Sequence, residues 1–394
     1  MKIIIAVPIT LVMVYRAWSK ASLTHAGIVA AILTAGAHAV HPWNLPFGLL
    51  ITFFLAGTRV TKVCILTIFR FKKTHGWQVK QHIKSKLTIH ASGDVGKEGS
   101  RTHVQVFANS GVASVLSILH AYQLIHREEN YCHSWPGNLL FIGIVANYAA
   151  VAADTFSSEL GILSKSQPRL ITSLTLRKVP PGTNGGVTFF GLVAAVLGSS
   201  IIVIASILLT PFCQSSIPKN ERDGSRTWTF SDKLKFSIAM IIWGALGSVL
   251  DSFLGGWLQQ SVVDTKSGKI VEGNGGKKVH VETSKNNVQG ERLPRDGTFK
   301  KEQWKQKNKL SEDPDSSSHY FEGDSSLKID NLNEESSSIS SSSLEMKPCR
   351  VVESGSLAWL DNNEVNFVMA LTMSIGAMVI ASWTLQVPLS CILP

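Results

Sequence analysis

The chain has 394 residues, a formal net charge of +10 at pH 7 and 44% hydrophobic residues. Its apolar residues gather into runs of about 18 or more with few charges, the length that crosses a bilayer core, which argues against a soluble multidomain protein. Most of the basic charge lies between these runs or in one polar tract. Nucleic-acid binding is therefore not needed to explain the charge.

The apolar runs predict an all-α fold, a polytopic membrane helical bundle of about eight spans, with six to eight as the range. The first run is the shortest, so a signal-peptide segment or signal anchor is an alternative to a retained helix. No convincing small-residue cleavage site follows it, which favours retention. The expected spans lie near 3–15, 23–41, 47–69, 104–125, 138–160, 187–210, 236–256 and 365–386.

The chain is expected to divide into three parts. Residues 1–264 hold the first seven spans, and residues 351–394 hold the last span and complete the membrane domain. Residues 265–350 between them are polar, with Lys-rich pieces and the serine run ESSSISSSSLE near their end. Such a composition cannot bury a core, so this segment is predicted to be a disordered cytosolic insert.

Lys and Arg counts in the loops predict the orientation. The 70–103 and 161–186 loops are rich in both and are placed in the cytosol, whereas the 42–46 and 126–137 loops are placed on the opposite side. The 211–235 loop belongs with the latter pair but carries five basic residues, so it fits less well. Both termini then lie opposite the cytosol. The five cysteines lack a CxxC spacing and predict neither a metal site nor a disulfide framework.

The stretch RKVPPGTNGG predicts a phosphate-binding loop. Glycines free the backbone to expose N–H groups, and the cations beside them suit phosphate oxygens. A tight turn between two membrane helices is the alternative. The residues concerned are Arg177, Lys178, Gly182, Thr183, Asn184, Gly185 and Gly186.

Polar residues continue from the 70–103 loop into the fourth span in DVGKEGSRTHVQVFAN. Asp94, Glu98, Arg101, Gln105 and Asn109 are three or four positions apart, which places them in one helical stripe. An exposed amphipathic approach to the membrane is the alternative, but it explains the last two poorly because polar groups inside a span are costly.

The fifth span ends with two carboxylates and two hydroxyls. Asp154 with Ser158, and Thr155 with Glu159, are pairs at i, i+4 on this helix end. Oxygen ligands of this kind suit Mg²⁺, which one or two carboxylates and the substrate's phosphates usually hold. The sequence therefore predicts a metal-assisted phosphate site here.

Two further clusters are expected to emerge on the same cytosolic face. Asp251 lies in the otherwise apolar seventh span within WGALGSVLDSFLGGWLQQ, where an acid is by default a functional-site hypothesis. At the start of the last span, capping accounts for only one or two of four polar residues. These four are Asp361, Asn362, Asn363 and Asn366.

The stretches DVGKEGSRTHVQVFAN, ADTFSSELGILSKSQPRLIT, RKVPPGTNGGVTFFG, GSVLDSFLGGWLQQ and LDNNEVNF resemble the transmembrane protein 19 family. That family includes the plant phytyl-phosphate kinase, so the resemblance implies a multi-pass membrane protein. It also implies transfer of phosphate from a nucleoside triphosphate to an isoprenyl monophosphate. Asp154-Thr155, Lys178 and Gly182-Thr183 are similar to a pattern in polyprenol kinases and cytidylyltransferases, which suggests CTP as donor.

These features together predict a CTP- or ATP-dependent isoprenyl-phosphate kinase in the endoplasmic reticulum or another endomembrane. No plastid transit peptide is present, so a plastid location is not supported. Transport of a phosphorylated or anionic solute is the alternative, as is a non-catalytic membrane protein. The expected partners are a nucleotide and an isoprenyl phosphate, with no nucleic acid; the sequence leaves the oligomeric state open.

The predicted roles divide the candidate residues into three sets. Asp154, Asp251, Lys178 and Arg101 are predicted to be catalytic, and Asp154, Glu159 and Asp251 to hold Mg²⁺. The predicted phosphate-binding set is Lys97, Arg177, Gly182, Thr183, Asn184, Gly185, Gly186, Asp361, Asn362 and Asn363.

Overall fold

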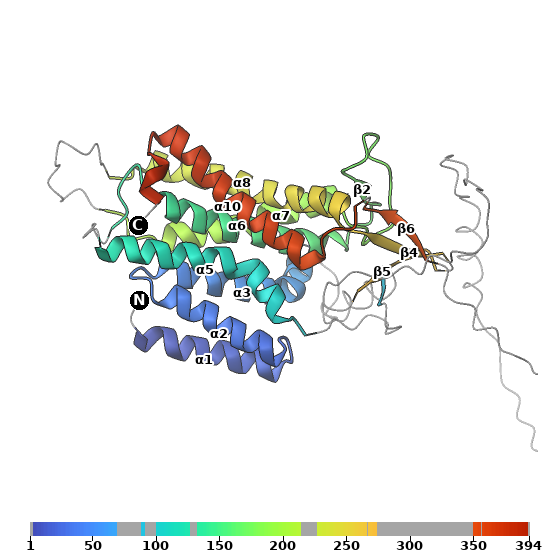
Figure 1. The fold of residues 1–394 in the computed structure, drawn as a ribbon, viewed down its shortest axis with the longest axis horizontal. Coiled ribbons are helices and arrows are strands. Elements are labelled where there is room, and N and C mark those ends of the chain that lie inside the picture. The colour runs from blue at the N-terminus through green and yellow to red at the C-terminus, as the bar shows by residue number, and fades with distance from the viewer. Residues whose placement is uncertain are drawn as a thin grey trace, which may run out of the picture. The chain divides into compact units, whose positions relative to one another are not determined.

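The computed structural model describes residues 3–68, 88–90, 100–126, 132–213, 227–265, 267–273, 350–355 and 357–392. Helices dominate these ranges, and each of them overlaps one predicted span (Figure 1). They are α1 (Ile3–Ser19), α2 (His25–Ala39), α3 (Leu45–Ile68), α5 (His103–His126), α6 (Leu139–Gly161), α7 (Phe189–Leu209), α8 (Phe230–Leu258) and α10 (Asn362–Leu385).

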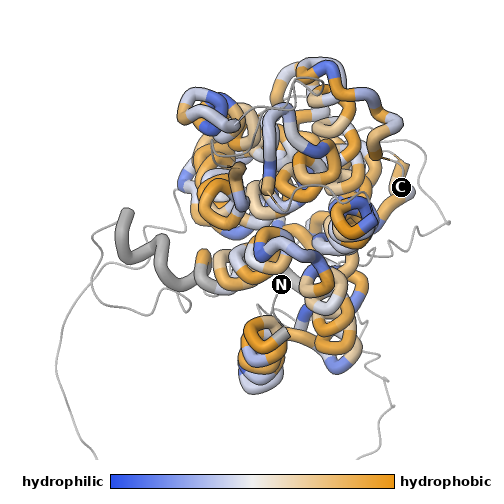
Figure 2. Tube along the Cα trace, turned by 90° about the vertical axis from the view of Figure 1, so that its left-hand side faces the viewer, coloured by the Kyte–Doolittle hydropathy of each residue, from blue (hydrophilic) through white to orange (hydrophobic). Residues whose placement is uncertain are grey.

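The helices have the length and composition of a membrane bundle. In the described part of the chain, α5, α6, α7, α8 and α10 are long and apolar enough to cross a bilayer, and α1 to α3 contribute shorter apolar helices. Much of the helical tube is coloured as hydrophobic in Figure 2. The predicted helical membrane bundle is confirmed.

Side-chain caps explain where several helices begin. Thr24, Asn138 and Thr188 each accept a hydrogen bond from a backbone N–H in the first turn of α2, α6 and α7. Thr229 and Asp361 start α8 and α10 with reciprocal capping boxes. These bonds satisfy N–H groups that have no partner inside the helix.

Helix α6 lies at the centre of the bundle and packs against α3, α5, α7, α8 and α10. Every residue from Leu139 to Ala153 is buried. Its alanine-rich half meets glycines of its neighbours: a Cβ added at Gly198 of α7 would lie 2.5 Å from the Ala152 carbonyl oxygen, and one at Gly247 of α8 2.6 Å from the Ala150 Cβ. Small residues thus bring these helices into backbone contact.

Short strands accompany the bundle, which the all-α prediction does not include. β1 (Thr88–His90), β5 (Lys269–Glu272), β4 (Ser261–Asp264) and β6 (Arg350–Ser354) form a sheet in the order β1-β5-β4-β6. β2 (Arg169–Leu170) pairs antiparallel with β3 (Gly186–Val187). β5 lies inside the predicted 265–350 insert, so ordered backbone extends to Gly273; residues 274–349 lie outside the described residues.

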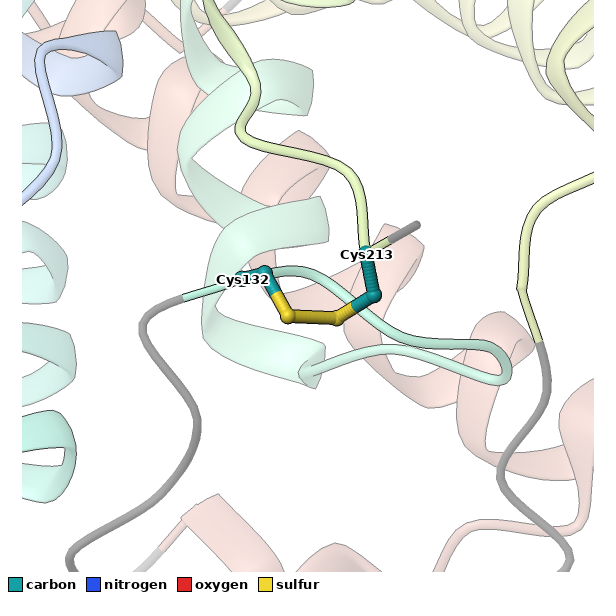
Figure 3. Close-up of a disulfide and its surroundings, with 2 residues drawn as sticks. All are labelled: Cys132 and Cys213. Atoms are coloured by element: carbon teal, nitrogen blue, oxygen red, sulfur yellow. A yellow bond between two sulfur atoms is a disulfide. The ribbon is translucent and has the colours of Figure 1, made fainter. Parts of the chain in front are cut away.

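A disulfide joins Cys132, in the α5–α6 connection, to Cys213, after α7 (Figure 3). The cysteine spacing predicts no disulfide framework, and this is wrong because 81 residues separate the two partners and no local motif marks them. Backbone hydrogen bonds from His133 N–H to Pro211 O and from Cys213 N–H to His133 O hold the same two loops together. We call this part of the bundle the disulfide end, and the opposite part, which carries the β2–β3 loop, the loop end (Figure 1).

A histidine and tryptophan cluster fills the disulfide end beneath the bond. His41 and His120 are 3.0 Å apart between ring nitrogens, and the Trp43 ring packs edge-on against both His120 and His133. The His133 ring also stacks on Trp228. Burial lowers the pKa of His133 to about 3, so this side chain is neutral at physiological pH.

The buried His133 predicts acid sensitivity of the fold. An unfolded histidine has a pKa of about 6.5, so between about pH 6.5 and 3 the unfolded chain holds a proton that the folded chain does not, and stability falls as the pH drops. His133→Phe keeps an aromatic ring and removes the titration. The unfolding free energy should fall between pH 7 and pH 5 in both proteins, but by less in the variant. We expect the difference to be about 1.4 kcal/mol for each pH unit below 6.5. Melting curves in detergent at both pH values measure this, and equal losses in both proteins would contradict it.

The disulfide also predicts orientation. Disulfides persist on the oxidising side of a membrane, so the loop end should face the cytosol. With the free cysteines replaced by serine, Thr175→Cys at the exposed tip of the 161–186 loop should react with an impermeant maleimide only after the plasma membrane is selectively permeabilised. If labelling also required the internal membranes to be opened, the loop end would face away from the cytosol and the predicted orientation would be wrong.

Candidate functional site

Two acids from different helices meet near the loop end of the bundle. The side chains of Asp154 on α6 and Asp251 on α8 lie within hydrogen-bonding distance of one another, and both are half-buried. Two ionised carboxylates at this separation repel each other, so a proton or a cation must lie between them. The structure thus brings together the two acids on which the predicted metal site depends.

Helix α10 supplies a third polar group to this pair. With its amide nitrogen turned toward the acceptors, Asn366 donates to Asp251 Oδ1 at 3.0 Å and to the Asn362 carbonyl at 3.1 Å. Farther along, Gln259 Nε2 donates to Asn362 Oδ1 at 3.5 Å, so the C-terminal end of α8 and the N-terminal end of α10 are linked by side chains. Three helices therefore contribute to one polar region.

The glycine loop packs directly onto α8 beside this region. Gly185 has φ of +81°, and a Cβ added there would lie 2.6 Å from Gly256 Cα and 3.0 Å from the Ser252 carbonyl oxygen. Ser252 follows Asp251 in the chain. The loop therefore reaches α8 within about one turn of the acid pair, and Gly185 is required both for its backbone conformation and for this close approach.

Several N–H groups of the loop bond within the protein. The N–H of Thr183 donates to Pro180 O, that of Gly186 to Thr183 O and that of Asn184 to Ser261 Oγ at 2.9 Å. These donors shape the turn and tie it to β4, which is the role given by the tight-turn alternative. The predicted phosphate role then depends on the remaining groups of the loop, which include the exposed Gly182, and on the cations before it.

The two cations before the glycines differ in their contacts. Arg177 forms an ion pair with Glu353 of β6 and donates to the Glu353 carbonyl at 2.7 Å. Lys178 is exposed, and its backbone bridges to Arg169. Arg177 therefore joins the glycine loop to the strand that follows the 274–349 segment, and an incoming phosphate would have to compete with Glu353 for it.

At the start of α10 the structure gives Asp361 a capping role. Its Oδ1 accepts from the N–H groups of Asn363 at 2.8 Å and Glu364 at 2.9 Å, and its own N–H donates to Glu364 Oε2. Asn363 is buried, whereas Asn362 is exposed and reaches Gln259. Helix capping therefore accounts for Asp361, while Asn362 and Asn366 extend toward α8.

The predicted stripe into the fourth span is not one continuous helix. α5 begins at His103, and Arg101 before it lies in a parallel backbone bridge with Leu23. Gln105 and Asn109 lie on α5, whereas Lys97, Asp94 and Glu98 lie outside the described residues. Arg101 is thus placed by the α1–α2 turn.

Glu159 belongs to a different surface from the acid pair. It follows Asp154 by five residues, which turns it about 140° around the helix axis. It lines a cavity between α1, α2, α3 and α5. Across the described residues no group of three or more His, Cys, Asp or Glu side chains could hold a metal. The structure therefore does not bring Glu159 together with Asp154 and Asp251.

Asn147 is a buried polar residue of α6 that the sequence reasoning passes over. Its Nδ2 donates to the Asn109 carbonyl at 3.3 Å, and Ser374 of α10 donates to its Oδ1 at 3.4 Å. Asn147 precedes Asp154 by about two helical turns and so lies on the same face. An amide inside the apolar stretch IVANYAAVA is the signal that could have found it.

The acid pair has the donor chemistry that Mg²⁺ requires. Mg²⁺ is usually held by one or two carboxylates plus substrate phosphates, so two contacting carboxylates that need a positive charge between them fit this ion. Asn366 holds the Asp251 carboxylate by a hydrogen bond, as outer partners commonly do for metal-binding carboxylates.

Comparison with known proteins agrees with this architecture. Residues 8–374, which reach from the first helix into the last, match the family described as "Integral membrane protein DUF92". The chain belongs to this family. The match confirms the resemblance on which the sequence interpretation relies, and the protein is an integral membrane protein.

Two relatives of this DUF92 protein differ in how much they share. It is 31% identical over 276 residues to Protein PGR of Arabidopsis thaliana, which covers 68% of this chain and 83% of the relative. It is 50% identical over 72 residues to an uncharacterized membrane protein of Methanocaldococcus jannaschii, covering 18% of this chain and 29% of the relative. No solved structure matches.

The contact of the glycine loop with α8 gives a direct test. Gly185→Ala places a methyl group 2.6 Å from Gly256 Cα at a φ of +81°, so we expect a loss of at least about 1 kcal/mol in unfolding free energy and a lower melting temperature. Gly36→Ala is the control, because a Cβ there meets nothing within 4 Å. Equal melting temperatures for Gly185→Ala and the wild type would contradict the packing role.

Proposed function

We propose that this DUF92 protein is a membrane kinase that transfers a phosphoryl group from a nucleoside triphosphate, CTP or ATP, to an isoprenyl monophosphate. The reaction would take place at the loop end of the bundle. The observation that carries the proposal is the contact between Asp154 and Asp251, with Asn366 bound to the second acid and the glycine loop packed beside it.

Asp154 and Asp251 would hold Mg²⁺, which when bound neutralises the charge of the donor phosphates. Phosphoryl transfer needs positioning and charge neutralisation more than covalent chemistry from the protein. Asn366 keeps the Asp251 carboxylate oriented through its hydrogen bond. Asn147, packed between α5 and α10, would hold the helix face that carries Asp154.

Lys178 and Arg177 would contact the donor phosphates, with Gly182 as the exposed backbone of the same loop. Arg177 would exchange its ion pair with Glu353 for a phosphate oxygen. Arg101, placed by backbone bonds to the α1–α2 turn, would contact the acceptor phosphate. Each of the four residues predicted from the sequence to be catalytic thus has a role in the proposed reaction: Asp154 and Asp251 hold the metal, Lys178 contacts the donor and Arg101 contacts the acceptor.

The depth of the acid pair favours a kinase over a transporter. Asp154 and Asp251 each lie about two helical turns before the end of their helix, which is about 10 Å along the axis. Transporter sites tend to lie near the bilayer midplane on broken helices, whereas α6 and α8 are unbroken through both acids. A nucleotide arriving from water could reach this depth, and an acceptor lipid could approach from the membrane. An endomembrane with its cytosolic face at the loop end is the proposed location.

Neutralising either acid tests the proposal. Asparagine keeps the side-chain shape but removes the charge that binds a hard cation, so Asp154→Asn and Asp251→Asn should each lower transfer at least 100-fold on the estimate that metal stabilisation is worth several kcal/mol. Purified protein is incubated with labelled CTP or ATP, Mg²⁺ and geranylgeranyl monophosphate, and labelled diphosphate is measured. The double variant should be no worse than the poorer single one, because the two acids act as a unit.

Asp264→Asn is the matched control, since Asp264 accepts hydrogen bonds from Ser267 in a turn after β4 and asparagine also suits such turns. It should retain wild-type transfer. Folded Asp154→Asn or Asp251→Asn protein that transfers phosphate at the wild-type rate would sink the role assigned to that acid.

A further inference from the structure

A cavity of about 530 Å³ lies between α1, α2, α3 and α5, with Glu159 of α6 also on its wall. Of the residues that line this cavity, the proposed reaction uses only Arg101. Small-molecule sites typically have volumes of about 300–1,000 Å³ and mostly apolar walls, so the cavity has the size of a binding site. The helices that enclose it can be followed in Figure 1.

The floor of the cavity is apolar and closed. Phe47, at the start of α3, is buried and forms a core with Ala6 of α1 and Ala35 of α2. The wall above it carries Leu50, Ile51, Phe53 and Phe54 along α3. Because α3 begins beside the histidine and tryptophan cluster, this closed floor faces the disulfide end.

The opposite part of the lining is polar and basic. Arg16 and Lys20 come from the end of α1, and Arg101 comes from just before α5. The backbone of Arg101 donates to Ser22 O at 3.0 Å and accepts from the Thr24 N–H at 3.0 Å, which fixes it at the α1–α2 turn. Among the described residues of the lining, the charged ones are these three cations and one acid, Glu159. Arg and Lys at one mouth suit a phosphate.

This polar part lies at nearly the same level along α6 as the acid pair. Glu159 follows Asp154 by about 7.5 Å along the α6 axis, from the rise of 1.5 Å per residue. Gly57, on the cavity wall, lies against the residue after Asp154, because a Cβ added to it would be 3.8 Å from Thr155 Cγ2. A group bound among the three cations would therefore lie at nearly the same depth along α6 as the acid pair, on another face of that helix.

We infer that this cavity binds a single-chain lipid phosphate monoester, with its apolar chain against the α3 wall and its phosphate among Arg16, Lys20 and Arg101. The inference rests on the proposed function for the identity of this lipid as the phosphoryl acceptor. It assigns α1 a part in the binding site, and it makes Phe47 and Ala35 the residues that limit chain length.

Binding measured without nucleotide tests the site apart from the reaction. Calorimetry on the full chain in detergent measures the Kd for geranylgeranyl monophosphate. Geranylgeraniol and inorganic phosphate are measured separately, because each represents one half of that ligand. Arg16→Gln should raise the Kd for the monophosphate about ten-fold and leave that for the alcohol unchanged. Ala31→Leu, which adds bulk at the lining, should weaken both lipids by a similar factor. The wild type should bind inorganic phosphate far more weakly than the lipid.

Two control variants match these changes outside the cavity. Lys235→Gln removes an exposed charge from the disulfide-end part of α8, and Gly36→Leu adds bulk to α2 where a Cβ meets nothing within 4 Å. Both should bind like the wild type.

Phe47→Leu tests the limit on chain length. This variant should bind long-chain monophosphates more tightly than the wild type does, and the gain in affinity should be smaller for a short chain such as geranyl monophosphate.

The outcomes separate this inference from the proposed kinase. Wild-type binding of the monophosphate that both cavity variants weaken about ten-fold, with no phosphate transfer, supports the site and refutes the kinase. Phosphate transfer whose KM for the lipid is unchanged by both cavity variants overturns the site and leaves the kinase. Inorganic phosphate that binds as tightly as the lipid, without an effect of Ala31→Leu, also overturns it, because the apolar chain then contributes nothing.

Discussion

Close contact between the alanine-rich half of α6 and the glycines of α7 and α8 is the constraint on which the rest of the structure depends. A methyl group at Gly198, Gly244 or Gly247 would lie within 2.9 Å of α6 atoms, so these helices touch through their backbones. Lipid gives helices no hydrophobic reason to associate, and dispersion between close backbones takes its place. Asp154 and Asp251 follow these contacts by about one turn each, and the same close approach brings their carboxylates together.

The glycine loop also depends on close backbone contact, here between the loop and α8. Glycine, proline and flanking cations in RKVPPGTNGG suit a phosphate, but the backbone of Gly185 is first of all packed against Gly256 of α8. The two uses are compatible, since a loop that must lie within a turn of Asp251 needs a residue without a side chain at the contact. Packing thus explains Gly185, and the proposed phosphate contacts of the loop fall to Gly182 and Lys178, which are exposed.

Hydropathy predicts the helices because a membrane span needs a long apolar run, and each described helix ends within a few residues of its expected position. The strands escape prediction because they are only two to five residues long, and because β1 and β6 pair with partners far away in the sequence. The meeting of Asp154 with Asp251 follows in outline from their common face. The five-residue spacing of Asp154 and Glu159 already separates them around the helix, and the amide of Asn147 is visible in its apolar stretch. The partners of Asn147 on α5 and α10 could not be predicted, because they depend on how the helices are rotated against one another.

The Lys and Arg count and the disulfide indicate opposite sides of the membrane for the connection between α7 and α8. Three basic residues lie between α7 and α8 and two more lie in the first turns of α8, which fits poorly with an extracytosolic side. Cys213, in the same connection, is nevertheless bonded to Cys132, whose loop contains few Lys or Arg residues. Because successive helices run in opposite directions, the α5–α6 and α7–α8 connections lie at the same end of the bundle. The disulfide between them agrees with this topology, whereas the charge of the α7–α8 connection does not. Positive-inside bias is a statistical preference of insertion, and one loop can depart from it once neighbouring spans have set the orientation. Arg16, Lys20 and Arg101, the cations proposed to bind phosphate, then lie at the other end, where the bias and the proposed chemistry require the same sign of charge.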